Sequence, residues 1–213
     1  MRKKLNKNIG YYFITDNKLS LNGTINDVKN ACIAGVKIIQ YRNKSESIDK
    51  QYHEAHKLRQ ICKNYDVIFL INDRVDIALA VDADGVHLGQ DDLPYPVARK
   101  LLGKNKIIGV STHNVQEAKI AEFSNADYIG VGAMFETSTK KVEISGIETL
   151  KKIRAVVDLP IVAIGGINFK NMDQVIEAKA DGLASISAVL TKEDVISTIE
   201  EINQKFSDCR ILH

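Results

Sequence analysis

The chain has 213 residues, a formal net charge of +2 at pH 7 and 45% apolar residues. This length suits one domain with a sizeable core, and the interspersed charges of both signs argue against a nucleic-acid partner. The longest apolar runs are five residues, such as Val67–Ile71. A membrane-spanning helix needs roughly 20 consecutive apolar residues. We therefore expect no membrane partner and a cytoplasmic location.

Three cysteines stand alone in the sequence, at Cys32, Cys62 and Cys209. They form no Cys-x-x-Cys pair, and their number is odd. This pattern favours reduced structural thiols over disulfides or a zinc site.

Eight short apolar runs recur along the chain, and a stretch able to form a helix follows each of them. Strand and helix therefore alternate from end to end. Open doubly wound sheets share this alternation, but eight units of about 25 residues suit a compact (β/α)8 barrel. In chain order the runs are Tyr11–Thr15, Lys37–Arg42, Val67–Asn72, Gly85–Gly89, Ile107–Ser111, Tyr128–Gly132, Pro160–Gly166 and Gly182–Val189.

Helical periodicity supports this alternation between the predicted strands. Ile48, Tyr52, Ala55, Leu58 and Ile61 follow one another at spacings of 4, 3, 3 and 3, which predicts a helix with one buried stripe. A second stripe closes the sequence. We therefore predict an α/β fold, a single TIM barrel over residues 1–213, with flexible tails at 1–9 and 207–213. The second stripe consists of Val195, Ile199, Ile202 and Phe206.

Basic side chains end the second predicted strand. In a TIM barrel the ligand site lies at the C-terminal ends of the strands, so the residues that end each run are candidates for chemistry. Gln40, Arg42 and Lys44 alternate along the chain and therefore point to one side. Two cations on one side suit an anion, although pairing with carboxylates such as Glu46 would also explain them.

Acidic residues end the next two predicted strands. Asp73 follows Val67–Asn72, and Asp92 follows Gly85–Gly89. Neighbouring carboxylates repel unless a cation lies between them, and Mg²⁺ typically takes one or two carboxylates. Asp73 could instead cap the following helix. His87 could serve as a general base near pH 7, or could be a packed, hydrogen-bonded barrel histidine.

Hydroxyl and glycine residues end the later strands. Ser111 could touch a ligand or cap the next helix. The sixth run leads into the hydroxyl-rich segment Thr137–Lys140, and the last two runs contain Gly165-Gly166 and Ser185–Ala188. Many barrels bind a phosphoryl group through backbone amides at these two strands, although helix packing would also suit Gly165. A reaction that joins two phosphorylated molecules would use both this cradle and the metal site.

A series of motifs over almost the entire chain resembles the thiamine-phosphate synthase family, also called thiamine-phosphate pyrophosphorylase. The resemblance implies that a hydroxymethylpyrimidine diphosphate is joined to a thiazole phosphate with release of diphosphate, and that Mg²⁺ is required. The matching segments are Tyr12–Asp16, Gln40–Lys44, Ile71–Asp76, Ala83–Asp92, Thr137–Lys140, Ile161–Ile167 and Ser185–Ala188.

The resemblance also implies residue roles. The metal would be held by Asp73 and Asp92. The pyrimidine diphosphate would be held by Gln40, Arg42, Lys44, Asn72, Ser111 and Lys140, of which Arg42, Lys44, Ser111 and Lys140 would be catalytic. The thiazole phosphate would be held by Thr137, Ser138, Thr139, Gly166, Ile186 and Ser187.

The implied mechanism is a dissociative substitution, in which diphosphate leaves first and the thiazole nitrogen captures a methylene cation stabilised by the aminopyrimidine. Such chemistry needs charge stabilisation and positioning, with no nucleophilic side chain. Glu136 departs from the family pattern, which often has proline there, and Asn43 occupies a position that is commonly acidic. Two alternatives are a thiazole tautomerase of the same barrel family and a non-catalytic thiazole-phosphate-binding module. Neither needs the metal acids Asp73 and Asp92, so their presence favours the synthase.

Overall fold

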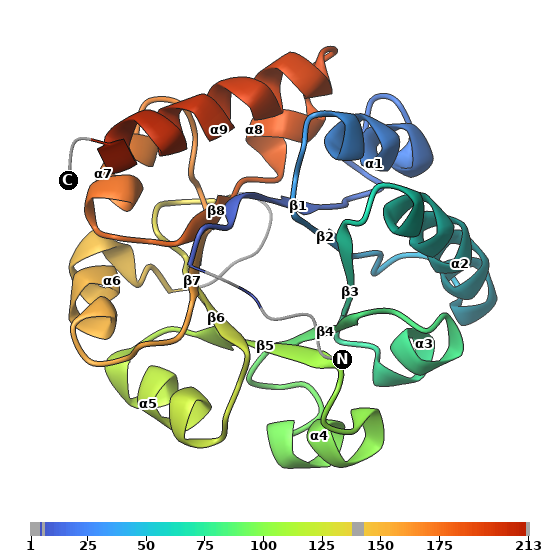
Figure 1. The fold of residues 1–213 in the computed structure, drawn as a ribbon, viewed down its shortest axis with the longest axis horizontal. Coiled ribbons are helices and arrows are strands. Elements are labelled where there is room, and N and C mark those ends of the chain that lie inside the picture. The colour runs from blue at the N-terminus through green and yellow to red at the C-terminus, as the bar shows by residue number, and fades with distance from the viewer. Residues whose placement is uncertain (1–4, 6, 138–142, 212–213) are drawn as a thin grey trace.

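A computed structural model describes residue 5 and residues 7–137 and 143–211, with side chains described as far as Asp208. In this part of the chain, parallel strands close into a barrel in the order β1 to β8, and the helices form a ring outside them (Figure 1). The predicted TIM barrel is confirmed. The strands are β1 (Gly10–Ile14), β2 (Ile38–Tyr41), β3 (Ile68–Asn72), β4 (Gly85–Leu88), β5 (Ile107–Thr112), β6 (Tyr128–Val131), β7 (Ile161–Ile164) and β8 (Gly182–Ala184). The helices are α1 (Thr24–Ile33), α2 (Ile48–Asn64), α3 (Val75–Ala80), α4 (Tyr95–Leu102), α5 (Val115–Phe123), α6 (Gly146–Arg154), α7 (Met172–Glu177), α8 (Ser187–Leu190) and α9 (Val195–Ile211).

The last predicted strand is divided in the structure. The run Gly182–Val189 contains the short strand β8 and then the helix α8, whose first bond runs from the backbone N–H of Leu190 to the oxygen of Ile186 at 2.9 Å. The prediction of one strand over the whole run was wrong. A short apolar run fits a buried helix as well as a strand, so composition alone could not separate the two.

Secondary structure and backbone hydrogen bonds extend into both segments that the sequence predicts as tails. Helix α9 continues through Ile211, so the segment expected to be a tail from 207 is helical as far as that residue. The backbone N–H of Ile9 donates to Asp181 at 3.0 Å, one residue before β1 begins. The flexibility of the outermost residues stays a prediction.

The two predicted helical stripes differ in how fully they are buried. In the final helix every member of the stripe is buried. In α2, Ala55 and Leu58 are buried, but Ile48 is 59% exposed. Ile48 is the first residue of α2, directly after its N-cap Ser47, and the stripe makes its buried contacts further along the helix.

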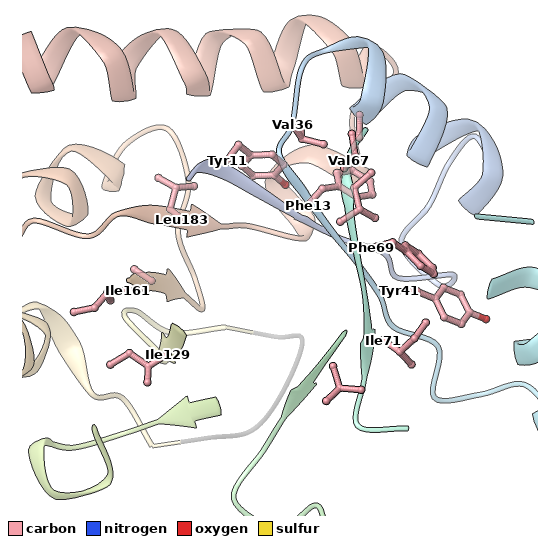
Figure 2. Packing of buried hydrophobic residues seen from close by; sticks show 14 of the residues in the cluster. Tyr11, Phe13, Val36, Tyr41, Val67, Phe69, Ile71, Ile129, Ile161 and Leu183 are labelled. Atoms are coloured by element: carbon pink, nitrogen blue, oxygen red, sulfur yellow. The ribbon is translucent and has the colours of Figure 1, made fainter. Parts of the chain in front are cut away.

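Strand alternation divides the apolar side chains between two cores. Outward-facing residues pack between the sheet and the helices, where Figure 2 shows Tyr11, Phe13, Tyr41, Phe69 and Ile71. The other face of each strand fills the inside of the barrel. Because successive side chains alternate, a residue near the end of a strand either joins the helix layer or faces the barrel interior. The interior cluster contains Ile9, Tyr12, Ile14, Ile38, Leu70, Ile107, Tyr128, Val162 and Ala184.

Three of the even-numbered strands begin with the same arrangement. A residue with positive φ, then alanine, then aspartate precede β4, β6 and β8; the φ values are 51° for Asp82, 62° for Asn125 and 62° for Lys179. Each aspartate accepts a backbone N–H of another strand and pairs with an arginine of a helix. We call these the three Asp–Arg pairs. They are Asp84 with Arg59 at 3.0 Å, Asp127 with Arg99 at 2.8 Å and Asp181 with Arg154 at 3.0 Å.

The Asp–Arg pairs lie at the N-terminal ends of the strands. Asp84 accepts the N–H of Phe69 at 2.9 Å, Asp127 that of Ile108 at 2.8 Å and Asp181 that of Ile161 at 2.9 Å. A charged acceptor strengthens these bonds, and each arginine balances the charge that burial would otherwise disfavour. This end of the barrel is therefore built for stability.

Cys32 and Cys62 are buried free thiols, as expected, while the side chain of Cys209 lies beyond the described side chains. Of the helices in the described residues, none combines the length and the apolar content that a bilayer crossing requires.

Candidate active site

A cavity of about 200 Å³ opens at the C-terminal ends of the strands, as the barrel fold predicts. The structure brings nearly all predicted site residues to this cavity, because each lies near or just after the C-terminal end of one of the strands β2 to β8. Ser138, Thr139 and Lys140 lie outside the described residues. The predicted residues that line the cavity are Gln40, Arg42, Lys44, Asn72, Asp73, Asp92, Ser111, Thr137, Gly166, Ile186 and Ser187.

Arg42 is held at the rim by the end of β1. Its Nη1 donates to Asp16 Oδ2 at 2.9 Å, and its backbone N–H donates to Thr15 Oγ1 at 2.8 Å. Asp16 also accepts the backbone N–H of Lys18 at 3.1 Å, which fixes the carboxylate. The alternative partner Glu46 instead pairs with Lys50 at 2.9 Å. Arg42 is therefore oriented by Asp16, a residue for which the sequence suggested no role.

The two predicted metal ligands follow β3 and β4. Asp73 has a φ of 61°, and its backbone N–H donates to the oxygen of His87 at 2.8 Å. Its carboxylate pairs with Lys44 Nζ at 3.1 Å. Helix α3 has no side-chain cap bond, so the alternative role of Asp73 as a helix cap is wrong. Asp92 accepts the backbone N–H of Gly89 at 2.7 Å.

Asp73 and Asp92 act on each other electrostatically. Burial and the neighbouring Asp73 carboxylate raise the pKa of Asp92 above its ordinary value, while Lys44 lowers it. Two carboxylates in this position disfavour each other's charge unless a cation joins them. Among the described residues no histidine, cysteine or third acidic residue completes a cluster with them. Oxygen ligands that leave most positions to water and phosphate are the donor set that suits Mg²⁺, so these residues fit that ion.

A chain of hydrogen bonds crosses the interior of the barrel beside the cavity. Gln40 Nε2 donates to Tyr12 Oη at 2.8 Å, and Tyr12 Oη lies 2.8 Å from Tyr128 Oη. Tyr128 Oη lies 2.8 Å from His87 Nδ1, and His87 Nε2 lies 2.9 Å from Ser111 Oγ. All five side chains line the cavity. We call this series the interior chain; it joins the predicted ligands Gln40 and Ser111 through three residues given no such role.

Glycines make room for the interior chain. A Cβ on Gly109 would lie 2.1 Å from Cζ of Tyr128, and one on Gly130 would lie 3.0 Å from Cε1 of His87. Desolvation in the barrel lowers the pKa of His87 to about 4, although Asp92 raises it. Burial also raises the pKa of Tyr128 well above its ordinary value. The interior chain is therefore uncharged at neutral pH. With so low a pKa His87 is a weak base, and both of its ring nitrogens are hydrogen-bonded, which favours the packed histidine over the general base.

The residues of the predicted phosphate cradle follow β6, β7 and β8, which lie across the barrel from β2, β3 and β4. The backbone N–H of Phe135 donates to the oxygen of Gly165 at 3.0 Å, so the loop after β6 runs beside the end of β7. Gly166 has a φ of 68°, and a Cβ there would lie 2.3 Å from the oxygen of Glu136. Glycine is therefore required by this loop contact. The packing of Gly165 is against Ala133 of the same loop, at 2.7 Å from its would-be Cβ, and this explains Gly165 better than a helix contact.

Comparison with known proteins identifies the family. A family model described as thiamine monophosphate synthase matches residues 11–189. The thiamine-phosphate synthase of Methanosarcina barkeri is 49% identical over 196 residues, which cover 91% of this chain and 89% of that protein. That of Clostridium tetani is 43% identical over 207 residues, covering 95% and 99%. The solved structure of a thiamine phosphate pyrophosphorylase from Pyrococcus furiosus matches with a TM-score of 0.87 and 41% identity, covering 95% of this chain and 98% of that one. The chain belongs to the thiamine monophosphate synthase family.

Proposed function

We propose that this protein is a thiamine-phosphate synthase. It joins 4-amino-2-methyl-5-(diphosphooxymethyl)pyrimidine to a (carboxy)thiazole ethyl phosphate and releases thiamine phosphate and diphosphate, together with CO2 when the thiazole carries the carboxyl group. The observation that carries the proposal is one cavity in which Asp73 and Asp92 lie with Arg42 and Lys44, in a chain of this family. We also propose that its substrates are small molecules only and that it acts in the cytoplasm.

The charged residues suit the departure of diphosphate. Arg42 is fixed by Asp16 and needs little rearrangement to meet a phosphate oxygen, and Lys44 brings a second cation to the same rim. Positive groups held in place where negative charge develops lower the barrier of such a step. Bound at Asp73 and Asp92, Mg²⁺ would neutralise charge on the departing diphosphate. The ion pair between Asp73 and Lys44 would weaken if a bound cation balanced the charge of Asp73, and Lys44 would then be available to contact phosphate.

The uncharged residues suit positioning. Gln40, Asn72 and Ser111 line the cavity and offer an amide or a hydroxyl to the aminopyrimidine. On the other side, Thr137, Gly166, Ile186 and Ser187 would hold the thiazole phosphate beside it. Two substrates fixed in one cavity react without a nucleophilic side chain, because loss of diphosphate leaves a methylene cation that the thiazole nitrogen captures. The catalytic set is then Arg42, Lys44, Ser111 and Lys140.

The test is to incubate the purified protein with both substrates, with Mg²⁺ and after its removal by a chelator. We expect thiamine phosphate and diphosphate only when Mg²⁺ is present. Isomerised thiazole phosphate without condensation would identify the tautomerase, and binding without any conversion would identify the binding module. The matched control variant is Asp91→Asn, because Asp91 is an exposed carboxylate next to Asp92 that does not line the cavity.

A further inference from the structure

The interior chain has two ends that meet the cavity at different strands. Gln40 lies on β2 and Ser111 on β5, and the links between them come from Tyr12 on β1, Tyr128 on β6 and His87 on β4. The interior chain therefore joins residues of five strands, and the two atoms of each hydrogen bond are 2.8 to 2.9 Å apart. Bonds of this length leave no room for water between the partners.

The donor at one end decides the direction of every bond. An amide nitrogen only donates, so Tyr12 Oη accepts from Gln40. Tyr128 Oη is the other described partner of this hydroxyl, and we therefore direct the single proton of Tyr12 toward it. Tyr128 then donates to His87 Nδ1. A neutral imidazole that accepts at Nδ1 carries its proton on Nε2, and this proton goes to Ser111 Oγ. The hydroxyl proton of Ser111 is left for an acceptor in the cavity.

We propose that the interior chain is directional and that it fixes Ser111 as a hydrogen-bond donor toward the substrate. Tyr12, Tyr128 and His87 are then positioning residues, which act through Ser111 and Gln40. The partner of Ser111 is an acceptor atom of the pyrimidine diphosphate, either a ring nitrogen or a phosphate oxygen. The identity of this partner rests on the proposed function, whereas the direction of the chain does not.

The opposite direction has a different consequence for recognition. If Gln40 presented its oxygen to Tyr12, every proton would shift one place, and His87 would carry its proton on Nδ1. Ser111 would then donate to His87 and could only accept from a ligand. The tautomer of His87 therefore reports the direction of the whole chain.

The first measurement is ¹⁵N NMR of the imidazole rings in the ligand-free protein. The signals of His87 are assigned by replacing His53, His56, His113 and His213 in turn, so that the chain stays intact. We expect His87 to be neutral with its proton on Nε2. A proton on Nδ1 in the wild-type protein overturns the proposal without any variant of the barrel interior.

The second measurement reverses the donor. In Gln40→Glu at about pH 9, where a carboxylate is ionised, the side chain can only accept, so Tyr12 must donate to it. Each bond then turns, and we expect the proton of His87 to move to Nδ1, three residues away from the change. The control is Gln40→Glu with Tyr12→Phe, in which the route is cut and the proton stays on Nε2. No change in the single variant, or the same change in both, overturns the proposal.

The third measurement concerns the positioning role. We expect Tyr12→Phe and Tyr128→Phe each to lower kcat/KM for the pyrimidine diphosphate by about tenfold, the loss for one buried hydrogen bond. The KM for the thiazole phosphate should stay unchanged. Tyr41→Phe is the matched control, because Tyr41 is a buried tyrosine next to Gln40 whose Oη donates to Glu54 at 2.7 Å, away from the chain.

Equal effects on both substrates, or the same loss in Tyr41→Phe, would contradict the positioning role. If the wild-type protein makes no thiamine phosphate, the proposed function fails. The direction of the chain is still decided by the two NMR measurements, so the two failures are distinguishable.

Discussion

Asp92 is unfavourably placed when no cation is bound. Its pKa is raised by burial and by Asp73, and a carboxyl group whose pKa rises on folding binds its proton more tightly in the folded state. The folded state therefore becomes more stable as the pH falls through the pKa of Asp92, and less stable as this group ionises. The site keeps a charge that costs stability, as expected where function needs it.

The first prediction follows for Asp92→Asn. The amide still accepts the N–H of Gly89 but removes the repulsion with Asp73, so the metal-free protein should gain about 1–3 °C in Tm at pH 7. Turnover should fall by at least about 100-fold, because charge stabilisation at the leaving group is lost. Differential scanning calorimetry and a diphosphate-release assay test both parts. A lower Tm together with normal turnover would reverse the assigned role, and Asp91→Asn should change neither.

The residue pattern predicted the rim better than the interior. Gln40, Arg42 and Lys44 could be found because they are polar residues at alternate positions at the end of an apolar run, and all three line the cavity. Tyr12 and Tyr128 could not, since an aromatic residue within a strand is equally expected in the helix layer, as Tyr11 and Tyr41 are. Which tyrosine faces inward depends on the register of strands that are distant in sequence.

At the scale of the element, β5 and β6 are built around small residues. Gly109 pairs in register with both His87 and Tyr128, so the ring of Tyr128 occupies the space that a side chain on β5 would fill. β5 therefore has no side chain at this interior position, and this leaves room for the Tyr128 hydroxyl to contact Tyr12 and His87. Gly130 does the same for His87 from β6.

The second prediction is that Gly109→Ala destabilises the fold and reduces activity. The new Cβ must displace the Tyr128 ring, an overpacking that costs about 1–3 kcal/mol. Chemical denaturation measures the loss. Adding Tyr128→Leu should restore part of the stability and none of the activity, since the clash is relieved while the interior chain stays broken. A fully stable and active Gly109→Ala variant would contradict the prediction, because it would show that the Tyr128 ring can move without loss of packing or activity.

The third prediction concerns the N-terminal ends of the strands. Asp181 accepts the N–H of Ile161 at 2.9 Å, pairs with Arg154 at 3.0 Å and is only 5% exposed. Asp181→Ala leaves the backbone N–H of Ile161 without its acceptor and Arg154 without its counter-ion, although Arg154 still donates to the oxygen of Leu159. The free energy of unfolding should therefore fall by about 3 kcal/mol.

The activity of the molecules that remain folded should not change, because Asp181 is far from the cavity lining. Urea denaturation and a kcat measurement at low temperature test the two statements. The control is Asp158→Ala, whose exposed carboxylate pairs with Lys7 at 3.5 Å and should contribute less than about 1 kcal/mol. Equal losses in both variants would remove the distinction between buried and exposed pairs.

Elements were predictable where their period was clear. The eight strand positions follow from runs that alternate with helical stripes, and α9 from a stripe in which Val195, Ile199, Ile202 and Phe206 are all buried. The run Gly182–Val189 is the exception, because β8 ends after three residues and α8 begins within the same run. Tertiary pairing with β1 and β7 sets that limit, and no local pattern records it.

At the scale of the whole molecule, α9 helps the barrel to close. Figure 1 shows α9 across the junction of β8 and β1, between α7 and α1. Asn203 on α9 accepts the backbone N–H of Tyr11 at 2.9 Å, so the last helix is bonded to the first strand. A barrel closed by its two chain ends depends on both of them.

The fourth prediction compares two truncated chains. A chain that ends at Asp194 lacks α9 and exposes the outer face of β1 and β8, so we expect it to be unfolded or aggregated by circular dichroism and size-exclusion chromatography. A chain that ends at Ser207 keeps Asn203 and Phe206 and should retain a cooperative melt, with Tm within about 5 °C of the full chain. A well-folded, active protein ending at Asp194 would refute the closing role of α9.

The three Asp–Arg pairs and the cavity lie at opposite ends of the strands. Substitutions that change what the rim recognises leave the acceptors of Phe69, Ile108 and Ile161 in place. Over evolutionary time, substitutions at the rim can therefore change which phosphorylated ligand is bound. The Asp–Arg pairs, which do not contact the ligand, continue to stabilise the fold against heat.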